Sequence, residues 1–226
     1  MNIREKLLLN NKGLCEKGPI NIVILGDSVS QGALIDDFDY ESVYWNRLKK
    51  MLNAVNSEIP VNMICSAIAG TTASFALKRL QKGVFDHSPD LVIVCFGLND
   101  VNGEKSEYLD SLKIIFAKCK QEQTDVVFMT PNMLNTYVAD DTMENFREYA
   151  KITAEYQNSG RMDDYIYSAV KLAEEMEVTV CDCYSEWKKL SENEDTTLFL
   201  ANRINHPVRE MHQLFADKLY DIIINK

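Results

Sequence analysis

Four short turns contain the residues whose types could do chemistry. Ser28 follows an apolar run within the sequence GDSVSQG, and Asn99 follows another within GLND. Gly70 lies between them in a turn of small residues, and His206 stands near the C-terminus just before Pro207. A serine hydroxyl is a poor nucleophile until a neighbouring imidazole takes its proton, so Ser28 and His206 together would suit acyl transfer.

The turn that holds Ser28 does not match the common nucleotide-binding or hydrolase signatures. Gly26 and Gly32 do not form G-x-G-x-x-G, and no G-K-[ST] is present. Ser30 occupies the place of the second glycine of G-x-S-x-G, so the usual nucleophile elbow is also absent. What remains is a serine between a strand and a helix N-terminus, where backbone N–H groups are unpaired. Taken alone, Ser28 is more simply explained as a helix cap.

Apolar runs of strand length recur along the chain and are separated by segments with helical periodicity. Their cores are continuous Val, Ile and Leu, as expected for a parallel sheet that is covered on both faces. The predicted strands are residues 21–26, 61–65, 91–96, 125–130 and 178–182. Helical stripes cover residues 44–55, 109–119, 162–173 and 211–223, and Pro207 would suit the first turn of the last helix. The alternation predicts βαβ units in a three-layer α/β/α sandwich.

One segment interrupts this alternation. Residues 131–160 form a polar insertion with scattered tyrosines after the fourth predicted strand, and residues Thr142–Tyr156 could be helical. Insertions at that edge of a sheet often act as lids or substrate walls. Because no linker or repeat appears, we expect a single domain over residues 1–226 with this insertion beside the site.

The four turns together resemble the sequence blocks of the SGNH, or GDSL, family of esterases and lipases. GDS at residues 26–28 matches the first block, Gly70 the second, GLND at residues 97–100 the third, and His206 the last. The blocks occur in the family's order and span about residues 22–216. The resemblance implies a flavodoxin-like sheet of five parallel strands in the order 2-1-3-4-5. It would bring the turns together at the carboxyl ends of the strands, where open α/β sheets bind ligands.

The resemblance also implies a role for each matched residue. Ser28 would be the nucleophile and His206 its general base. The oxyanion of the tetrahedral intermediate would be bound by the N–H groups of Ser28 and Gly70 and by the side-chain amide of Asn99. Asp27 is expected to hold its turn by local hydrogen bonds. The two other histidines, His87 and His212, are expected to have no catalytic part.

The match to the family breaks in the last block, which usually reads Asp-x-x-His. Arg203 occupies the position of that aspartate, and a cation close to His206 would disfavour the protonated imidazole. We therefore expect Arg203 to point away or to contact an anionic group of the substrate. A backbone carbonyl could orient His206 in a Ser–His dyad, which we favour. Alternatively Asp182 or Asp195 could supply the carboxylate, or efficient catalysis has been lost.

Composition limits the partners of the protein. The 226 residues carry a formal net charge of −10, which argues against nucleic acid and anionic membranes as partners. No apolar run is long enough for a membrane span, and the N-terminus does not resemble a signal peptide, so we expect no membrane insertion and a cytoplasmic location. Six irregularly spaced cysteines predict free, buried thiols. Nothing indicates a metal or organic cofactor.

The sequence therefore predicts a carboxylic ester hydrolase that acts on a small-molecule ester through an acyl-serine intermediate. The polar insertion favours short, acetyl-type acyl groups on a small polar or carbohydrate carrier. A lipase or thioesterase for longer acyl chains is an alternative within the same chemistry. The missing aspartate motivates a competing class, a binding protein that keeps the fold without the reaction.

Overall fold

The computed structural model describes residues 3–225 and is built around one parallel sheet. Its five strands lie in the order β2-β1-β3-β4-β5, as the family resemblance implied. The strands are β1 (Ile20–Gly26), β2 (Val61–Cys65), β3 (Leu91–Cys95), β4 (Asp125–Met129) and β5 (Thr179–Cys181). All five predicted strands are confirmed, with shifts of at most one residue at any end.

Neighbouring strands are nearly level, which decides where the polar turns meet. Ile24 of β1 pairs with Cys65 on one side and with Ile93 on the other, and Gly26 pairs with Cys95. The turns that follow β1, β2 and β3 therefore emerge at one edge of the sheet. Because the strand order reverses between β1 and β3, this edge is also the switch point at which such sheets bind ligands.

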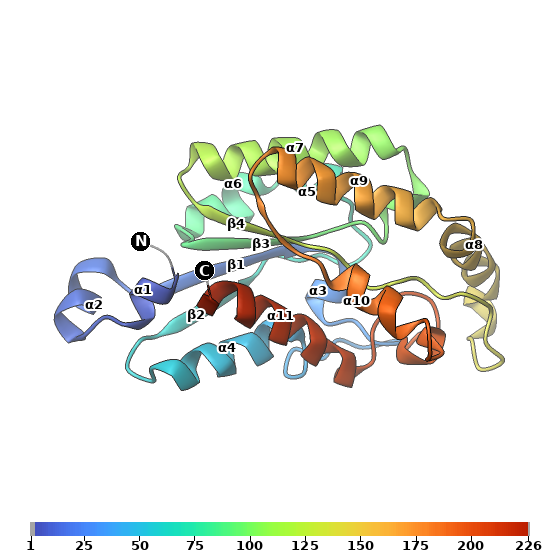
Figure 1. Ribbon diagram of the computed structural model, residues 1–226, viewed down its shortest axis with the longest axis horizontal. Coiled ribbons are helices and arrows are strands. Elements are labelled where there is room, and N and C mark those ends of the chain that lie inside the picture. The colour runs from blue at the N-terminus through green and yellow to red at the C-terminus, as the bar shows by residue number, and fades with distance from the viewer. Residues whose placement is uncertain (1–2, 226) are drawn as a thin grey trace.

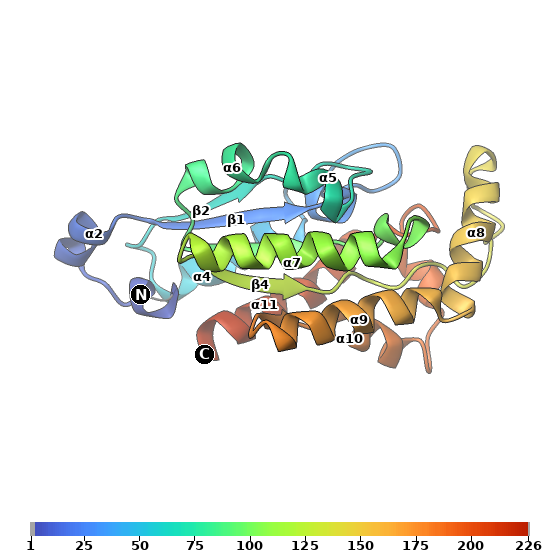
Figure 2. The ribbon, with the colours of Figure 1, turned by 90° about the horizontal axis from the view of Figure 1, so that it is seen from above.

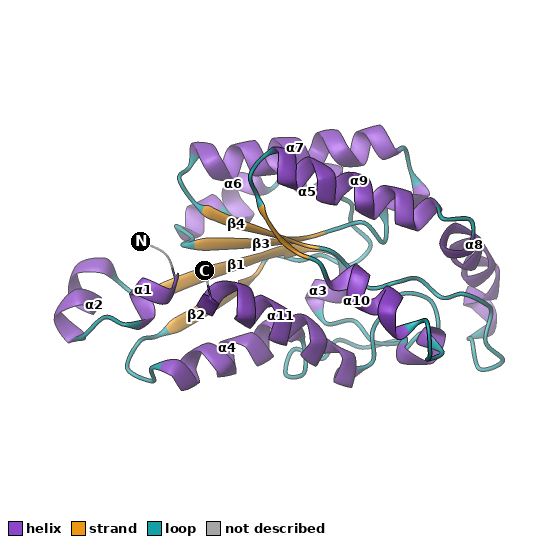
Figure 3. Cartoon of the chain, in the orientation of Figure 1, coloured by secondary structure: helices purple, strands orange, loops and turns teal. Residues whose placement is uncertain are grey.

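Helices cover both faces of the sheet and give the predicted three layers (Figures 1 and 2). The helices α4 (Tyr44–Val55) and α11 (His212–Asn225) pack together on one face. On the other face lie α5 (Ala73–Leu77), α7 (Lys105–Gln121) and α9 (Arg161–Glu175). The other helices are α1 (Ile3–Leu7), α2 (Asn11–Lys17), α3 (Ser28–Gln31), α6 (Leu80–Gly83), α8 (Arg147–Asn158) and α10 (Cys183–Leu190) (Figure 3).

The structure corrects the prediction at both ends of the chain and near the insertion. The helices α1, α2 and α10 were not predicted, and neither were the short helices α5 and α6 after β2. Pro207 does not start the last helix, because it pairs with Leu200 in an isolated antiparallel bridge and α11 begins only at His212. The helix expected from Thr142 begins at Arg147 instead, after a 3₁₀ turn over Glu144–Phe146.

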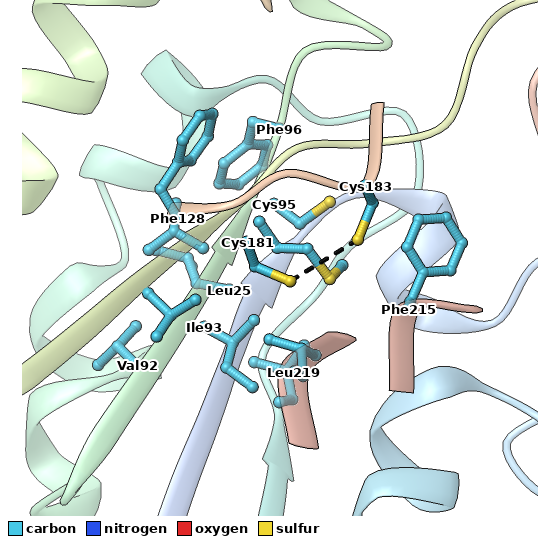
Figure 4. Packing of buried hydrophobic residues seen from close by; sticks show 14 of the residues in the cluster. Leu25, Val92, Ile93, Cys95, Phe96, Phe128, Cys181, Cys183, Phe215 and Leu219 are labelled. Carbon is cyan, nitrogen blue, oxygen red and sulfur yellow. Dashed lines mark hydrogen bonds between the residues drawn. The ribbon is translucent and has the colours of Figure 1, made fainter. Parts of the chain in front are cut away.

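The core lies on both sides of β3, whose five residues are all buried. Aromatic and aliphatic side chains from β3, β4 and α11 pack around three buried thiols, those of Cys95, Cys181 and Cys183 (Figure 4). All six cysteines are free, as expected, but Cys15 and Cys65 are exposed rather than buried. Within residues 3–225 no helix combines the length and the apolar character that a membrane crossing requires.

Candidate active site

Ser28 begins α3 immediately after the sharp turn at the end of β1. A side chain at Gly26 would place its Cβ 2.9 Å from the carbonyl oxygen of Cys95, so glycine permits the close approach to β3. Asp27 caps α3, because its carboxylate accepts a hydrogen bond from the N–H of Val29, as expected for a residue that holds the turn. As the first residue of the helix, Ser28 has no helical carbonyl within reach of its own N–H.

The imidazole of His206 meets the hydroxyl of Ser28 although the two residues are 178 positions apart. Nε2 of His206 lies 3.0 Å from Oγ of Ser28, and Nδ1 lies 2.6 Å from the carbonyl oxygen of Leu34. A carbonyl oxygen can only accept, so Nδ1 carries the hydrogen and Nε2 is left as the acceptor for the Ser28 hydroxyl. This is the tautomer that a general base for Ser28 requires.

Burial keeps the His206 ring neutral. Desolvation lowers the pKa of His206 below its ordinary value of 6.5, and the hydrogen bond to Leu34 opposes this effect only in part. A neutral imidazole at neutral pH is ready to accept a proton.

The side chain of Arg203 is directed away from this pair. Its guanidinium donates to both carboxylate oxygens of Asp141 and to the carbonyl oxygens of Leu198 and Leu200. These partners occupy most of its N–H groups. Arg203 therefore ties the turn before His206 to the insertion. Contact between Arg203 and a substrate stays a prediction.

The two candidate carboxylates are also occupied elsewhere. Asp182 caps α10 through the N–H of Ser185, and Asp195 caps a 3₁₀ turn over Thr196–Phe199 and accepts from the hydroxyl of Tyr137. The partner of Nδ1 in His206 is the backbone carbonyl of Leu34. A backbone carbonyl and neither of these carboxylates therefore contacts the ring of His206, and a catalytic Ser–His dyad stays a prediction.

The turn that carries His206 is fixed by a residue that sequence reasoning missed. Oδ1 of Asn202 accepts from the N–H groups of Ile204, Asn205 and His206, each at 3.0 Å. Asparagine often organises turns in this way, so its position four residues before the histidine was an available signal. The amide of Asn132 adds a second support by donating to the carbonyl oxygen of Asn205.

The insertion contacts the histidine turn through its first residues. Besides Asn132, the backbone N–H of Asn135 donates to the carbonyl oxygen of Ile204 at 2.9 Å. Helix α8 lies at the end of the molecule beyond the carboxyl ends of the strands (Figure 2). The segment therefore supports the His206 turn, and a lid function for it stays a prediction.

The other two matched turns place amide groups beside the nucleophile turn. Gly70 has a backbone φ of +73°, a conformation that favours glycine. Nδ2 of Asn99 donates to the carbonyl oxygen of Thr71 at 3.0 Å, which leaves the second N–H of this amide unassigned. The N–H of Gly70 has no acceptor within the described residues. Free donors on these turns are what a developing oxyanion needs.

Two buried carboxyl groups lie beneath these turns. Desolvation raises the pKa of Asp27 to about 7, and the nearby Asp100 adds to the effect. Desolvation likewise raises the pKa of Asp100 to about 6, although the N–H groups of Gly97 and Ala73 donate to it. Asp100 thus braces the turns after β2 and β3.

Neither of the remaining histidines is hydrogen-bonded to Ser28 within residues 3–225. His87 is exposed on a short turn. His212 is buried, and its Nδ1 accepts from the backbone N–H of Tyr44, so it connects α11 to α4. Among residues 3–225 no cluster of three or more His, Cys, Asp or Glu side chains could hold a metal ion.

Comparisons with known proteins identify the family and support the fold. Residues 24–214 match the model of the GDSL-like lipase/acylhydrolase family, and the chain belongs to this family of carboxylic ester hydrolases. No curated protein matches the sequence significantly.

Several solved structures share the fold at low sequence identity. A lipase/acylhydrolase from Enterococcus faecalis is 23% identical, with a TM-score of 0.71 and coverage of 91% of this chain and 96% of that one. The acetyl xylan esterase AlAXEase is 20% identical, with a TM-score of 0.71 and coverage of 91% and 100%. An acetylxylan esterase from Geobacillus stearothermophilus is 18% identical, with a TM-score of 0.69 and coverage of 90% and 94%.

Proposed function

We propose that this protein hydrolyses short-chain carboxylic esters through an acyl intermediate on Ser28, with His206 as the general base and acid. The observation that carries the proposal is the hydrogen-bonded series from Ser28 Oγ to His206 Nε2 and from His206 Nδ1 to the Leu34 carbonyl. A bare surface serine would lack both the acceptor for its proton and a device that fixes the tautomer of that acceptor.

In the first half-reaction Oγ of Ser28 forms a bond to the ester carbonyl carbon while its proton passes to Nε2 of His206. The tetrahedral intermediate collapses when the carbon–oxygen bond to the alcohol breaks, and His206 returns the proton to the leaving oxygen. A water molecule then attacks the acyl-serine with His206 again taking the proton. Collapse of this second intermediate releases the carboxylic acid and restores the Ser28 hydroxyl.

The oxyanion of both intermediates would be bound by three donors, the N–H groups of Ser28 and Gly70 and the free N–H of the Asn99 amide. Each comes from a different turn, and each turn is held by backbone contacts. Donors that are fixed before the reaction stabilise the developing charge without further reorganisation. The orientation of His206 by a carbonyl replaces the positioning role of the aspartate that the family usually has.

Two observations support a short acyl group on a small polar carrier as the substrate. A cavity of about 300 Å³ lies next to the segments that flank His206, with Leu34, Ile35 and Val208 as apolar walls and Asp37, Arg209 and Glu210 as polar ones; neither Ser28 nor His206 lines it. Two of the structural neighbours described above are named as acetylxylan esterases, which supports an acetylated carbohydrate as the substrate class.

The test is the turnover of a p-nitrophenyl ester series from acetyl to palmitoyl. We expect kcat/KM to be highest for the acetyl and other short esters and to fall as the acyl chain lengthens. Ser28→Ala, checked for native folding by circular dichroism, should abolish turnover throughout the series. A preference for palmitoyl would contradict the proposed substrate. Folded wild-type protein that turns over no ester would instead favour a binding protein.

A further inference from the structure

Several backbone N–H groups of the turn after β2 are engaged in hydrogen bonds. Ile68 donates to the carbonyl oxygen of Gly26 at 3.1 Å, and Thr71 donates to the carbonyl oxygen of Ile68 at 3.3 Å. Between them, Ala69 and Gly70 have no backbone acceptor. A side-chain acceptor for one of these two adjacent N–H groups would leave the other free for a ligand.

A side chain from the nucleophile helix takes the first of them. Oε1 of Gln31 accepts from the N–H of Ala69 at 2.7 Å, a short distance for an N–H donor. Gln31 is the last residue of α3, and Ser28 is its first. The helix that carries Ser28 is thus hydrogen-bonded directly to the turn that carries Gly70.

Helix α3 is itself anchored by hydrogen bonds, so the side chain of Gln31 extends from a fixed backbone. The indole N–H of Trp45 donates to the carbonyl oxygen of Ser30 at 2.8 Å, and the hydroxyls of Ser30 and Tyr44 lie 2.9 Å apart. Gly32 ends the helix at a φ of +87°, where a Cβ would lie 2.8 Å from the carbonyl oxygen of Asp39. Only Gln31 extends from this helix to the turn after β2 by a side-chain hydrogen bond, within the described residues.

We propose that Gln31 is a positioning residue that sets the oxyanion hole, because its carbonyl oxygen occupies the Ala69 N–H and so directs the Gly70 N–H toward the substrate oxygen. The proposal rests on the proposed esterase function. It assigns to Gln31 no contact with the substrate. Asn99 holds the same turn from its other end, through the carbonyl of Thr71.

Loss of the Gln31 oxygen leaves the turn anchored at Ile68 and Thr71 but free to rotate between them. The Gly70 N–H then spends part of its time away from the oxyanion. A positioning error of about 1 Å can reduce a rate about 100-fold, and removal of a complete oxyanion donor costs roughly 100- to 1000-fold. A mobile donor should cost less than an absent one.

The experiment compares Gln31→Met, which keeps the length of the side chain but has no oxygen acceptor, with the wild-type protein on p-nitrophenyl acetate. We expect kcat to fall about 10- to 100-fold while KM stays within about 2-fold, because the interaction matters in the transition state. The inhibition constant of a boronic acid, whose tetrahedral adduct on Ser28 mimics the intermediate, should rise by a similar factor. A purely structural role would not produce this pairing of effects.

Gln81→Met is the matched control, since Gln81 is an exposed glutamine on α6 whose amide donates to Asp86. It should leave kcat and the inhibition constant unchanged. Gln31→Ala removes the same acceptor and should behave as Gln31→Met does, which protects the test against misfolding of one variant. Unchanged kcat in a folded Gln31 variant would overturn the inference while the esterase function stands. Absence of esterase activity in the wild-type protein would overturn both.

Discussion

The nucleophile side and the histidine side of the site are held in different ways. On the nucleophile side, Ser28 and the turns with Gly70 and Asn99 follow three adjacent strands and brace one another through short contacts. On the histidine side, His206 lies in a turn that depends on Asn202 within the turn and on Asn132 from the insertion. The sheet positions the nucleophile side directly, whereas loop residues position the histidine side.

This difference explains why the departure from the family pattern falls where it does. The proposed oxyanion donors on the nucleophile side are two backbone N–H groups and the side-chain amide of Asn99, and their placement depends on particular glycines and caps. The histidine needs only an acceptor at Nδ1, and the carbonyl of Leu34 provides one. Because a carbonyl orients the ring, no carboxylate is needed at the position of the usual aspartate. Arg203 occupies that position and forms an ion pair with Asp141 instead.

The largest expected effect is on the histidine side. His206→Ala should reduce kcat for p-nitrophenyl acetate by about 10⁴-fold or more, because the Ser28 hydroxyl loses its proton acceptor. His87→Ala is the control, since His87 is exposed and outside the site. Retention of more than about a tenth of the activity by His206→Ala would mean that another group is the base.

On the nucleophile side, Asn99→Ala should reduce kcat by roughly 100- to 1000-fold with little change in KM, since the amide acts on the transition-state charge. Steady-state kinetics together with a thermal melt would separate this effect from loosening of the turn at Thr71. Untouched turnover would remove Asn99 from the oxyanion hole and leave the nucleophile side with backbone donors alone.

The pH dependence of kcat/KM should follow the protonation of His206 and not that of the buried Asp27. The base must be neutral, and the pKa of His206 is lowered by burial, so activity should persist below pH 6.5 and decline only as the pH falls through the lowered value. Asp27→Asn, which keeps the oxygen that accepts from Val29, should leave the midpoint of this acid limb in place. A midpoint at or above 6.5 in the wild-type protein would show that His206 is not desolvated as described.

Asp27→Asn also makes a prediction about stability. Burial raises the pKa of Asp27 to about 7, so the folded protein binds a proton that the unfolded chain releases near pH 3.8. The loss of unfolding free energy caused by burying this carboxyl is absent below pH 3.8 and grows as the pH rises toward 7. The Tm gain of Asp27→Asn over the wild-type protein should therefore be larger at pH 8 than at pH 4. Equal Tm differences at the two values would contradict the assigned burial effect.

The smallest effect is expected at Arg203. Arg203→Asp should change kcat by less than about 3-fold, because Leu34 already occupies Nδ1 of His206. The ion pair with Asp141 is partly exposed, with side-chain exposures of 22% and 62%, so its loss should cost about 1 kcal/mol of unfolding free energy or less. A gain of tenfold or more in kcat would show that the native site lacks a carboxylate.

The sheet and the residues on the nucleophile side could be predicted because they leave local marks in the sequence. Continuous apolar runs indicate buried parallel strands, and the GDS and GLND turns follow them directly. The partner of His206 could not be predicted, because every residue has a backbone carbonyl and nothing marks Leu34. The ion pair of Arg203 joins positions 62 residues apart in the sequence. The hydrogen bond from the Ala69 N–H to Gln31 depends on a side-chain direction that only the folded chain defines. Pro207 misled the prediction because a helix start and an extended bridge both accept proline.

The most direct test of the account is covalent labelling of Ser28 by a fluorophosphonate, followed by intact mass measurement and site mapping. The wild-type protein should gain one adduct, located on Ser28, and the folded His206→Ala variant should label far more slowly, since its hydroxyl has lost its base. An adduct on another residue, or equal labelling rates in the two proteins, would contradict the claim that His206, oriented by the Leu34 carbonyl, activates Ser28.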